Sequence, residues 1–115
     1  MAIKLHDMED ADIVRCIFEG QTKAFEVLLL RYQRIVFKIV HGRLPSDVVA
    51  EISHDIFIEA YQSLPKYNLH KSFQNWLTGI AVNICADYWR KHYRSLEIRM
   101  SDLGDDHRQW LDHIE

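Results

Sequence analysis

The segment 72–94, SFQNWLTGIAVNICADYWRKHYR, contains side chains whose chemistry suits contact with a nucleic acid. Guanidinium and ammonium groups bind phosphates or bases, while amides and carboxylates hydrogen-bond to base edges. An aromatic ring can stack on an unpaired base. With about 100° of turn per residue, Trp76 would lie beside one exposed helical strip. That strip would consist of Gly79, Asn83, Asp87, Arg90 and Arg94.

Basic charge is concentrated around this strip, although the chain of 115 residues has a net charge of −3. Residues 1–65 contain 7 Lys/Arg and 10 Asp/Glu, residues 66–99 contain 6 and 2, and residues 100–115 contain 1 and 5. A local basic patch matters more for nucleic-acid binding than the sum over the chain. A solvated helix end, whose cations compensate the helix dipole, remains an open interpretation.

Two residues near the strip each have two readings. Gly79 in mid-helix costs about 1 kcal/mol relative to alanine, so it is either simply tolerated or allows the backbone of a partner to approach. Trp76 is either a stacking surface or an aromatic residue at the edge of the core.

A second polar face belongs to the helix expected after residue 46. It combines carboxylates with an exposed isoleucine and consists of Asp47, Glu51, Asp55, Ile58 and Gln62, with His54 at its flank. An apolar side chain among carboxylates is typical of a surface that docks a protein, such as a basic helix. An ordinary solvated face with one apolar residue is the alternative.

Catalytic and metal-binding patterns are missing from the sequence. The 7 histidines are scattered and form no HxxxH or HExxH pattern, and neither a G-x-S-x-G motif nor a phosphate-binding glycine loop occurs. We therefore expect no enzymatic activity, no metal and no cofactor. Cys16 and Cys85 form no CxxC pair, which favours reduced cysteines in the core of a cytoplasmic protein.

The elements that must position these residues are four helices. The first follows Asp10 or Asp12 and ends at Gly20, and the second begins after Thr22, a plausible N-cap. The third runs from residue 46 or 47 to the proline at 65, and the fourth runs from Ser72 to about residue 94. The fold class is therefore all-α, a compact bundle of three main helices plus a short N-terminal helix.

The expected domain organisation is simple. Residues 1–9 form an N-terminal tail, residues 10–94 the helical domain, and residues 95–115 an acidic tail or the start of a linker. No apolar run approaches the length of a membrane span, and the first ten residues do not resemble a secretory signal.

Three segments in order carry a family resemblance: AFEVLLLRYQRIVFKIV, DVVAEISHDIFIEAYQSLPKYN and the segment 72–94. Together they resemble domain (region) 2 of bacterial sigma factors of the sigma-70 family, most closely the extracytoplasmic-function (ECF) group. The resemblance covers roughly residues 12–94. It implies a role in transcription initiation, in which the domain docks on core RNA polymerase and recognises and helps to melt the promoter −10 element.

The resemblance implies that the third helix binds the clamp-helix coiled coil of the largest polymerase subunit. The positions that match the family are Glu51, His54, Asp55 and Phe57. They agree with the polar face described above, which we call the acidic strip and which adds Asp47 and Ile58 to the expected contacts. The family usually has glutamine where this chain has His54.

The resemblance also implies contact with the non-template strand, with a flipped-out base held by the loop 67–72. Cations would hold phosphates, Asn83 and Asp87 would select bases, and two aromatic rings would stack beside the opened strand. The expected DNA-binding residues are Tyr67, Lys71, Ser72, Trp76, Asn83, Asp87, Arg90, Lys91 and Arg94.

The sequence departs from the family in two ways. Members commonly have a basic residue where this chain has Gly79, and the C-terminal helix-turn-helix domain expected to read the −35 element has no counterpart here. An anti-sigma factor is a further expected partner. The alternative function is a sigma-like mimic that binds an anti-sigma factor rather than promoter DNA.

Overall fold

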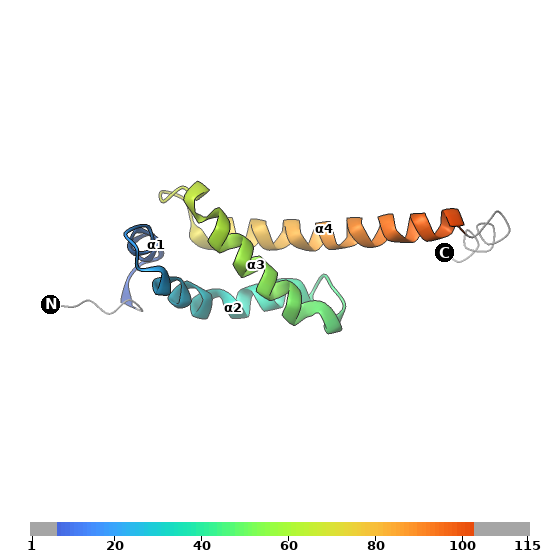
Figure 1. The fold of residues 1–115 in the computed structure, drawn as a ribbon. Helices are drawn as coiled ribbons and strands as arrows, with labels where there is room; N and C mark the ends of the chain where they lie inside the picture. Colours follow the sequence, from blue (N-terminus) through green and yellow to red (C-terminus); the bar gives the residue numbers. More distant parts are fainter. Residues whose placement is uncertain (1–6, 103–115) are drawn as a thin grey trace. The chain divides into compact units, whose positions relative to one another are not determined.

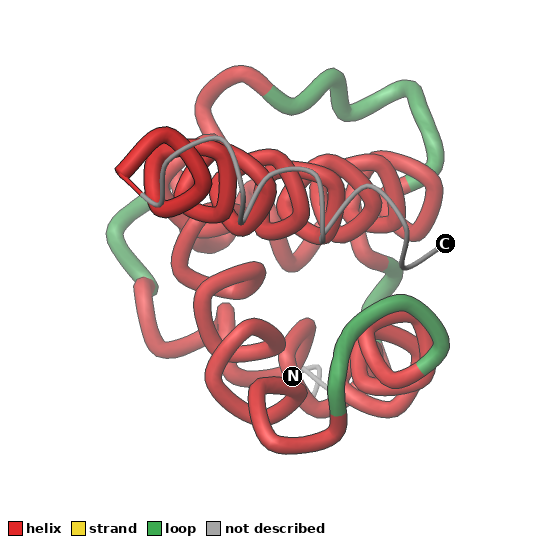
Figure 2. Tube along the Cα trace, turned by 90° about the vertical axis from the view of Figure 1, so that its right-hand side faces the viewer, coloured by secondary structure: helices red, strands yellow, loops and turns green. Residues whose placement is uncertain are grey.

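A computed structural model describes residues 7–102, and this part of the chain consists of helices joined by turns and loops (Figures 1 and 2). The α-helices are α1 (Asp10–Phe18), α2 (Phe25–His41), α3 (Val49–Ser63) and α4 (Phe73–Asp102). Short 3₁₀ turns at Thr22–Ala24, Ser46–Val48 and Leu64–Lys66 flank them. The described residues include no β-strand, so the all-α prediction is confirmed.

The chain divides into two compact units, Met1–Cys85 and Ala86–Glu115, and the boundary falls within α4. The first unit contains the core, in which α2 packs against both α1 and α3. Apolar residues at helical spacing fill this core, and burying each such side chain contributes about 1.5–3 kcal/mol. Those with almost no exposed surface include Ile13, Val14, Leu28, Val36, Val40, Val49, Ile56, Leu64, Leu77 and Cys85.

A polar network fastens the start of α1 to α2. The guanidinium of Arg31 donates to the carboxylate of Asp10 over 2.9 Å and also to the carbonyl of Met8. The hydroxyl of Tyr32 donates to the same carboxylate. Arg31 and Asp10 are about three-quarters buried, at 27% and 24% side-chain exposure, so this pair is better shielded from solvent than a surface ion pair.

The ends of α1 and α2 follow local rules with one exception. Gly20, just after α1, has φ = 106°, a conformation that glycine adopts without steric cost. The prediction that Thr22 caps α2 is wrong, because Thr22 lies within a 3₁₀ turn. The residue before α2 is Ala24, whose side chain cannot cap it.

The fourth helix begins as predicted and continues further than predicted. The hydroxyl of Ser72 accepts a hydrogen bond from the backbone N–H of Asn75 over 3.2 Å, which is the geometry of an N-cap. The prediction that the helix ends near Arg94 is wrong, since α4 continues to Asp102. No Gly or Pro interrupts the sequence between Gly79 and Gly104, so nothing stops the helix even where its side chains are exposed.

The two cysteines differ in burial. Cys85 lies in the core as expected, and burial raises the pKa of its thiol. Cys16 on α1 is only half-buried, and neither cysteine forms a disulfide.

Candidate nucleic-acid and docking surfaces

The loop 67–72 is closed by its own hydrogen bonds. The hydroxyl of Tyr67 donates to the carbonyl of Lys71, and the side chain of Asn68 accepts from the N–H of His70 over 2.9 Å. The Lys71 N–H also donates to the Asn68 carbonyl over 3.0 Å. The side chains of Lys71 and Ser72 remain exposed beside the start of α4. This loop therefore has a defined shape before any ligand arrives.

Tyr67 is not the open stacking surface that the sequence suggested. Its ring lies 5.1 Å from that of Trp76 and 5.5 Å from that of Phe73, and the residue is only 6% exposed. The physical reason is that these neighbouring rings enclose it while its hydroxyl is bound within the loop. Tyr67 thus shapes the loop from inside, and half-buried Trp76 is the more accessible ring of the pair.

A polar hollow of about 650 Å³ lies between this loop, the start of α1 and α2. Its walls include the network formed by Asp10, Arg31 and Tyr32, with His70 and Lys71 on the loop side. Burial and then the hydrogen bond to Asp10 raise the pKa of Tyr32 to about 12. The hollow therefore contains a neutral phenol next to the ion pair of Asp10 and Arg31.

The expected strip on α4 is exposed on both sides of the unit boundary. In the first unit, Gly79 and Asn83 are exposed, and a Cβ added to Gly79 would meet no atom within 4 Å. In the second unit, Arg90 donates to the carboxylate of Asp87, and both side chains are more than half exposed. Lys91 and Arg94 are also exposed, so these cations and the Asn83 amide are accessible to a ligand.

The second unit also contains a group of rings that the expected strip did not include. Tyr88, Trp89, His92 and Tyr93 are in mutual contact along α4, with ring centroids 5.3–6.3 Å apart. We call these four residues the aromatic cluster. The spacings of three and four residues, which separate Trp89 from His92 and from Tyr93, were the signal in the sequence, since such positions share a helix face.

The acidic strip begins in the turn Ser46–Val48 and continues along α3. Asp47, Glu51, His54 and Asp55 are exposed, and Ile58 is 43% exposed. Phe57 differs from the rest of the expected docking residues, because it is only 7% exposed. We therefore assign Phe57 to the floor of this surface rather than to its rim.

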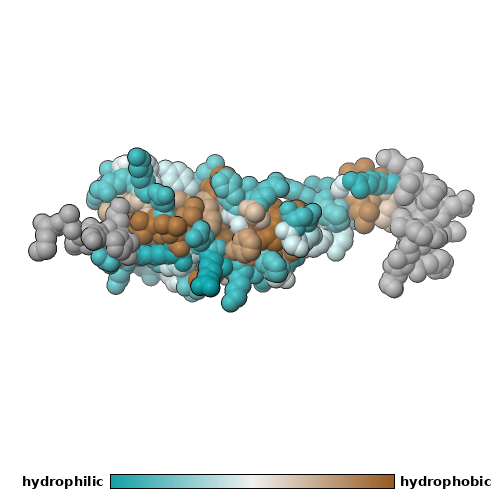
Figure 3. Space-filling model, turned by 90° about the horizontal axis from the view of Figure 1, so that it is seen from below, coloured by the Kyte–Doolittle hydropathy of each residue, from teal (hydrophilic) through white to brown (hydrophobic). Residues whose placement is uncertain are grey.

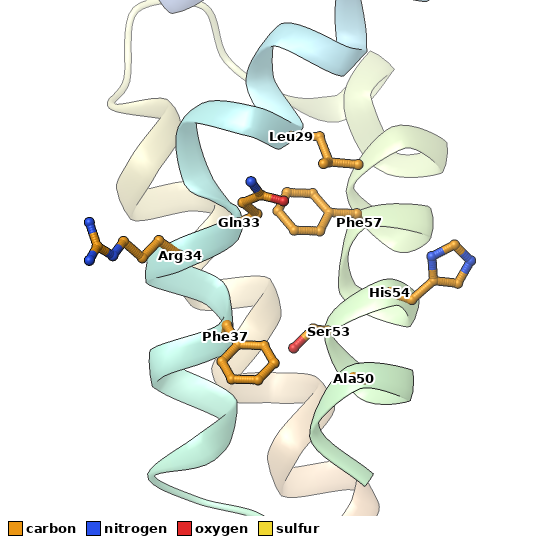
Figure 4. A pocket seen from close by; sticks show the side chains of 8 residues that line it. All are labelled: Leu29, Gln33, Arg34, Phe37, Ala50, Ser53, His54 and Phe57. Carbon is orange, nitrogen blue, oxygen red and sulfur yellow. The ribbon is translucent and has the colours of Figure 1, made fainter.

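A groove between α2 and α3 adjoins the acidic strip and was not foreseen from the sequence. It has a volume of about 660 Å³ and is lined by Leu29, Gln33, Arg34, Phe37, Ala50, Ser53, His54 and Phe57. The rings of Phe37 and Phe57 lie between the helices, whereas Arg34 and His54 point away from the groove at its edges (Figure 4). Phe37, 48% exposed, was the available signal, because it is apolar yet is not among the buried residues of α2, Leu28, Val36 and Val40.

Ser53 contributes a buried hydroxyl to the groove. The residue is 9% exposed, and its hydroxyl has no hydrogen-bond partner among the described residues. An unpaired buried hydroxyl costs free energy, so a partner that supplied a polar atom here would gain a hydrogen bond. A smaller hollow of about 220 Å³ lies beside the groove, also between α2 and α3, and its lining includes Phe25, Ile58 and Tyr61.

Apolar surface is visible elsewhere on the first unit. Seen from below, brown patches lie among hydrophilic side chains (Figure 3). On α2, Leu30 is 61% exposed.

Within residues 7–102, no group of three His, Cys, Asp or Glu residues is positioned to hold a metal ion. None of the helices in that range is long and apolar enough to cross a membrane.

Comparison with known proteins identifies relatives of this chain. It matches the family Sigma-70 region 2 over residues 28–95. It is 35% identical over 81 residues to the ECF RNA polymerase sigma-E factor of Escherichia coli (strain K12), and 30% identical over 81 residues to the protein of that name from Haemophilus influenzae. The matches cover 70% of this chain but only 42% and 43% of these relatives, so the chain spans less than half of their length.

Two solved structures share the fold. One is an engineered region 2 of sigmaE in complex with GTAAAA, with a TM-score of 0.74 and 34% identity, covering 79% of this chain and 96% of that one. The other is CnrH in complex with the cytosolic domain of CnrY, with a TM-score of 0.62 and 20% identity over 86% and 69% of the two chains. At 20% identity, the similarity to CnrH shows only that the two chains share a fold. The resemblance expected from the sequence is confirmed.

Proposed function

Because the chain belongs to the sigma-70 region 2 family, in its ECF group, we propose that it docks on core RNA polymerase and recognises and helps to melt the promoter −10 element. This activity would take place in the bacterial cytoplasm. The observation that carries the proposal is the exposure of polar side chains on α4, namely the Asn83 amide in the first unit and the Asp87 carboxylate with several cations in the second.

Base reading depends on Asn83 and Asp87 in this proposal. An amide can donate and accept at a base edge at the same time, and a carboxylate accepts from an exocyclic amino group. Arg90 donates one hydrogen bond to the Asp87 carboxylate and keeps further N–H donors for a phosphate. Lys91 and Arg94 then supply further, sequence-independent attraction to the strand.

Melting would be driven by capture of an unpaired base beside the loop 67–72. Extruding a base costs a few kcal/mol, which contacts in a preformed pocket can offset. The internal hydrogen bonds of the loop reduce the ordering cost of binding. Trp76 would stack beside the opened strand, whereas Tyr67 would support the loop from within.

Docking on polymerase would use the acidic strip and the groove together. Asp47, Glu51 and Asp55 would attract a basic helix, for which the clamp helices of the largest polymerase subunit are our proposed partner. Ile58 and the floor formed by Phe57 would then bury apolar side chains of that helix.

An anti-sigma factor is a second candidate partner. The apolar groove between α2 and α3 could bind an amphipathic helix from such a regulator, and a regulator seated there would compete with polymerase. A protein that used only this surface would be the sigma-like mimic.

The test is fluorescence anisotropy of single-stranded non-template oligonucleotides, with and without core polymerase. GTAAAA, the hexamer bound to region 2 of sigmaE, and a shuffled hexamer serve as probes. We expect preferential binding that weakens with salt, and Asn83→Ala should weaken it on the order of 10-fold. Asn75→Ala, an exposed asparagine elsewhere on α4, is the matched control.

The outcomes separate the candidate functions. If core polymerase captures the domain but the complex prefers no single-stranded sequence, the mimic gains support and the DNA-reading function is lost. If GTAAAA fails but another hexamer is preferred, the proposed function holds with a different −10 sequence.

A further inference from the structure

One face of α4 in the second unit is apolar and has no role in the function proposed above. Large apolar or aromatic residues follow one another there at spacings of four, three and four residues, namely Trp89, Tyr93, Leu96 and Met100. We call these four residues the apolar stripe. Tyr93 is 58% exposed and Leu96 is 41% exposed, while Trp89 and Met100 are half-buried.

The apolar stripe has the periodicity of a coiled coil. Alternating spacings of three and four residues place side chains at positions a and d of a heptad, through which two helices pack against each other. Tyr93 and Met100 take the a positions, and Trp89 and Leu96 take the d positions. The stripe therefore suits a second helix that lies along α4.

The apolar stripe is separate from the side chains proposed to hold DNA. With about 100° of turn per residue, its centre lies about a third of a turn away from that of Asp87, Arg90 and Arg94. In the heptad, Lys91 and Arg94 take the outer positions f and b, which lie away from the packed a and d residues. A helix that covered the stripe would leave these two cations accessible.

The charged residues beside the apolar stripe indicate which helix could cover it. Arg90 and Glu97 take the two e positions, and both are exposed. Charges at e and g positions form salt bridges between paired helices and set the choice of partner and its orientation. In an antiparallel pair of two copies of α4, the e positions face each other, so Arg90 of each copy would lie opposite Glu97 of the other. The surface is therefore complementary to itself.

The register of such a pair follows from the same charges. Placing Tyr93 of one copy against Leu96 of the other, and Trp89 against Met100, aligns Arg90 with Glu97 twice and joins an aromatic ring to a non-aromatic side chain in every layer. A shift by one heptad would bring Arg90 against Arg90 in one direction and Glu97 against Glu97 in the other. Because like charges repel, these two registers are disfavoured.

We propose that the second unit binds a second copy of this chain through the apolar stripe, as an antiparallel pair of α4 helices. The stripe covers about two heptads, whereas sustained coiled coils have at least about three to four, so the association is weak and depends on concentration. This interaction goes beyond the function proposed above, because it requires neither polymerase nor DNA.

Sedimentation equilibrium of the whole chain, from a few micromolar to several hundred micromolar, measures the association. We expect a shift from monomer to dimer across this range. Leu96→Glu places a charge within the apolar stripe and should weaken dimerisation by about 10-fold or more. Ile98→Glu is the matched control, because Ile98 is 59% exposed and takes the outermost position f, and it should have no effect. Circular dichroism checks that helicity is unchanged.

Charge reversal tests the antiparallel orientation. Arg90→Glu and Glu97→Arg should each weaken dimerisation several-fold, because like charges then meet across the pair. The double variant should restore it, since each copy again offers opposite charges to the other. In a parallel pair, e positions face g positions instead, and the double variant would stay weak.

The outcomes that would overturn the proposal are distinct. They are a chain that stays monomeric throughout, equal losses in Leu96→Glu and Ile98→Glu, and a double charge variant that does not regain dimerisation. If Leu96→Glu leaves self-association unchanged but lowers capture by core polymerase, the stripe belongs to polymerase docking and the proposal also fails. None of these results bears on the −10 function, because the sedimentation measurement contains no DNA.

Discussion

Tyr32 shows how one buried polar contact makes stability depend on pH. Burial is the main cause of its raised pKa, and the hydrogen bond that its hydroxyl donates to Asp10, which is also paired with Arg31, adds to that effect. Its pKa is raised from 10.0 to about 12, so the folded state holds this proton more tightly than the unfolded state does. The stabilisation from the neutral phenol is complete below pH 10 and is lost as the pH rises towards 12.

We predict that Tyr32→Phe removes part of the alkaline loss of stability. The urea midpoint of the wild type should fall more steeply between pH 10 and pH 12 than that of the variant, because phenylalanine has no proton to release. Urea unfolding followed by circular dichroism at the two pH values provides the measurement. Parallel declines in both proteins would contradict the raised pKa.

Individual residues were the least predictable feature of the site. Tyr67 looked like an exposed loop aromatic, but its burial depends on Phe73 and Trp76, which come from the following helix. Ser53 lies between the apolar Ile52 and Ile56 on α3, and nothing local indicated that its hydroxyl would face a groove formed with α2. The burial of Tyr67 and the position of the Ser53 hydroxyl both depend on residues of neighbouring helices, which the local sequence pattern does not reveal.

Among the helices, two glycines play different roles: Gly79 lies within α4, and Gly20 lies just after α1. Gly79 lies in mid-helix with open space around it, so its lack of a side chain is not required by packing. Gly20, by contrast, has a positive φ that other residues adopt only with strain.

We predict that Gly79→Ala raises the free energy of unfolding by about 1 kcal/mol, because alanine is the better helix former and its Cβ meets no atom. Gly20→Ala should lower it, which makes the two variants a matched pair. Chemical denaturation measures both. A loss of stability in Gly79→Ala would mean that this position is constrained by something beyond helix propensity.

The third helix supplies a prediction on docking. Asp55→Arg reverses one charge in the middle of the exposed acidic strip and should weaken association with core polymerase by more than about 10-fold, with helicity unchanged. Glu19→Arg makes the same charge change at an exposed position just after α1 and should leave association intact. Co-migration with core polymerase on a sizing column provides the measurement, and unaltered association of Asp55→Arg would remove α3 from the docking surface.

At the scale of the whole molecule, the helices were predictable because apolar periodicity, glycine and proline are local signals. On α2, for example, Leu28, Val36 and Val40 recur at helical spacing in the sequence, and all three are buried. The end of α4 was not predictable, since its last turns contain neither a core stripe nor a breaker. The groove was missed because it requires the packing of α2 against α3, which no single segment encodes.

The same chain thus combines two kinds of surface with separate chemistry. The acidic strip and the groove suit a protein, whereas the exposed strip of α4 suits a nucleic acid. A domain that holds polymerase by one surface and DNA by the other would couple strand capture to the enzyme that needs the open strand. The proposed function depends above all on base reading by Asn83 and Asp87.

Selection from a pool of randomised single-stranded hexamers, each flanked by constant sequence, tests that claim most directly. Wild-type chain bound to core polymerase should enrich a narrow set of hexamers, and Asn83→Ala should broaden that set while the salt dependence of binding is retained. Equal retention of all hexamers by the wild type, or an unchanged preference in Asn83→Ala, would contradict the account.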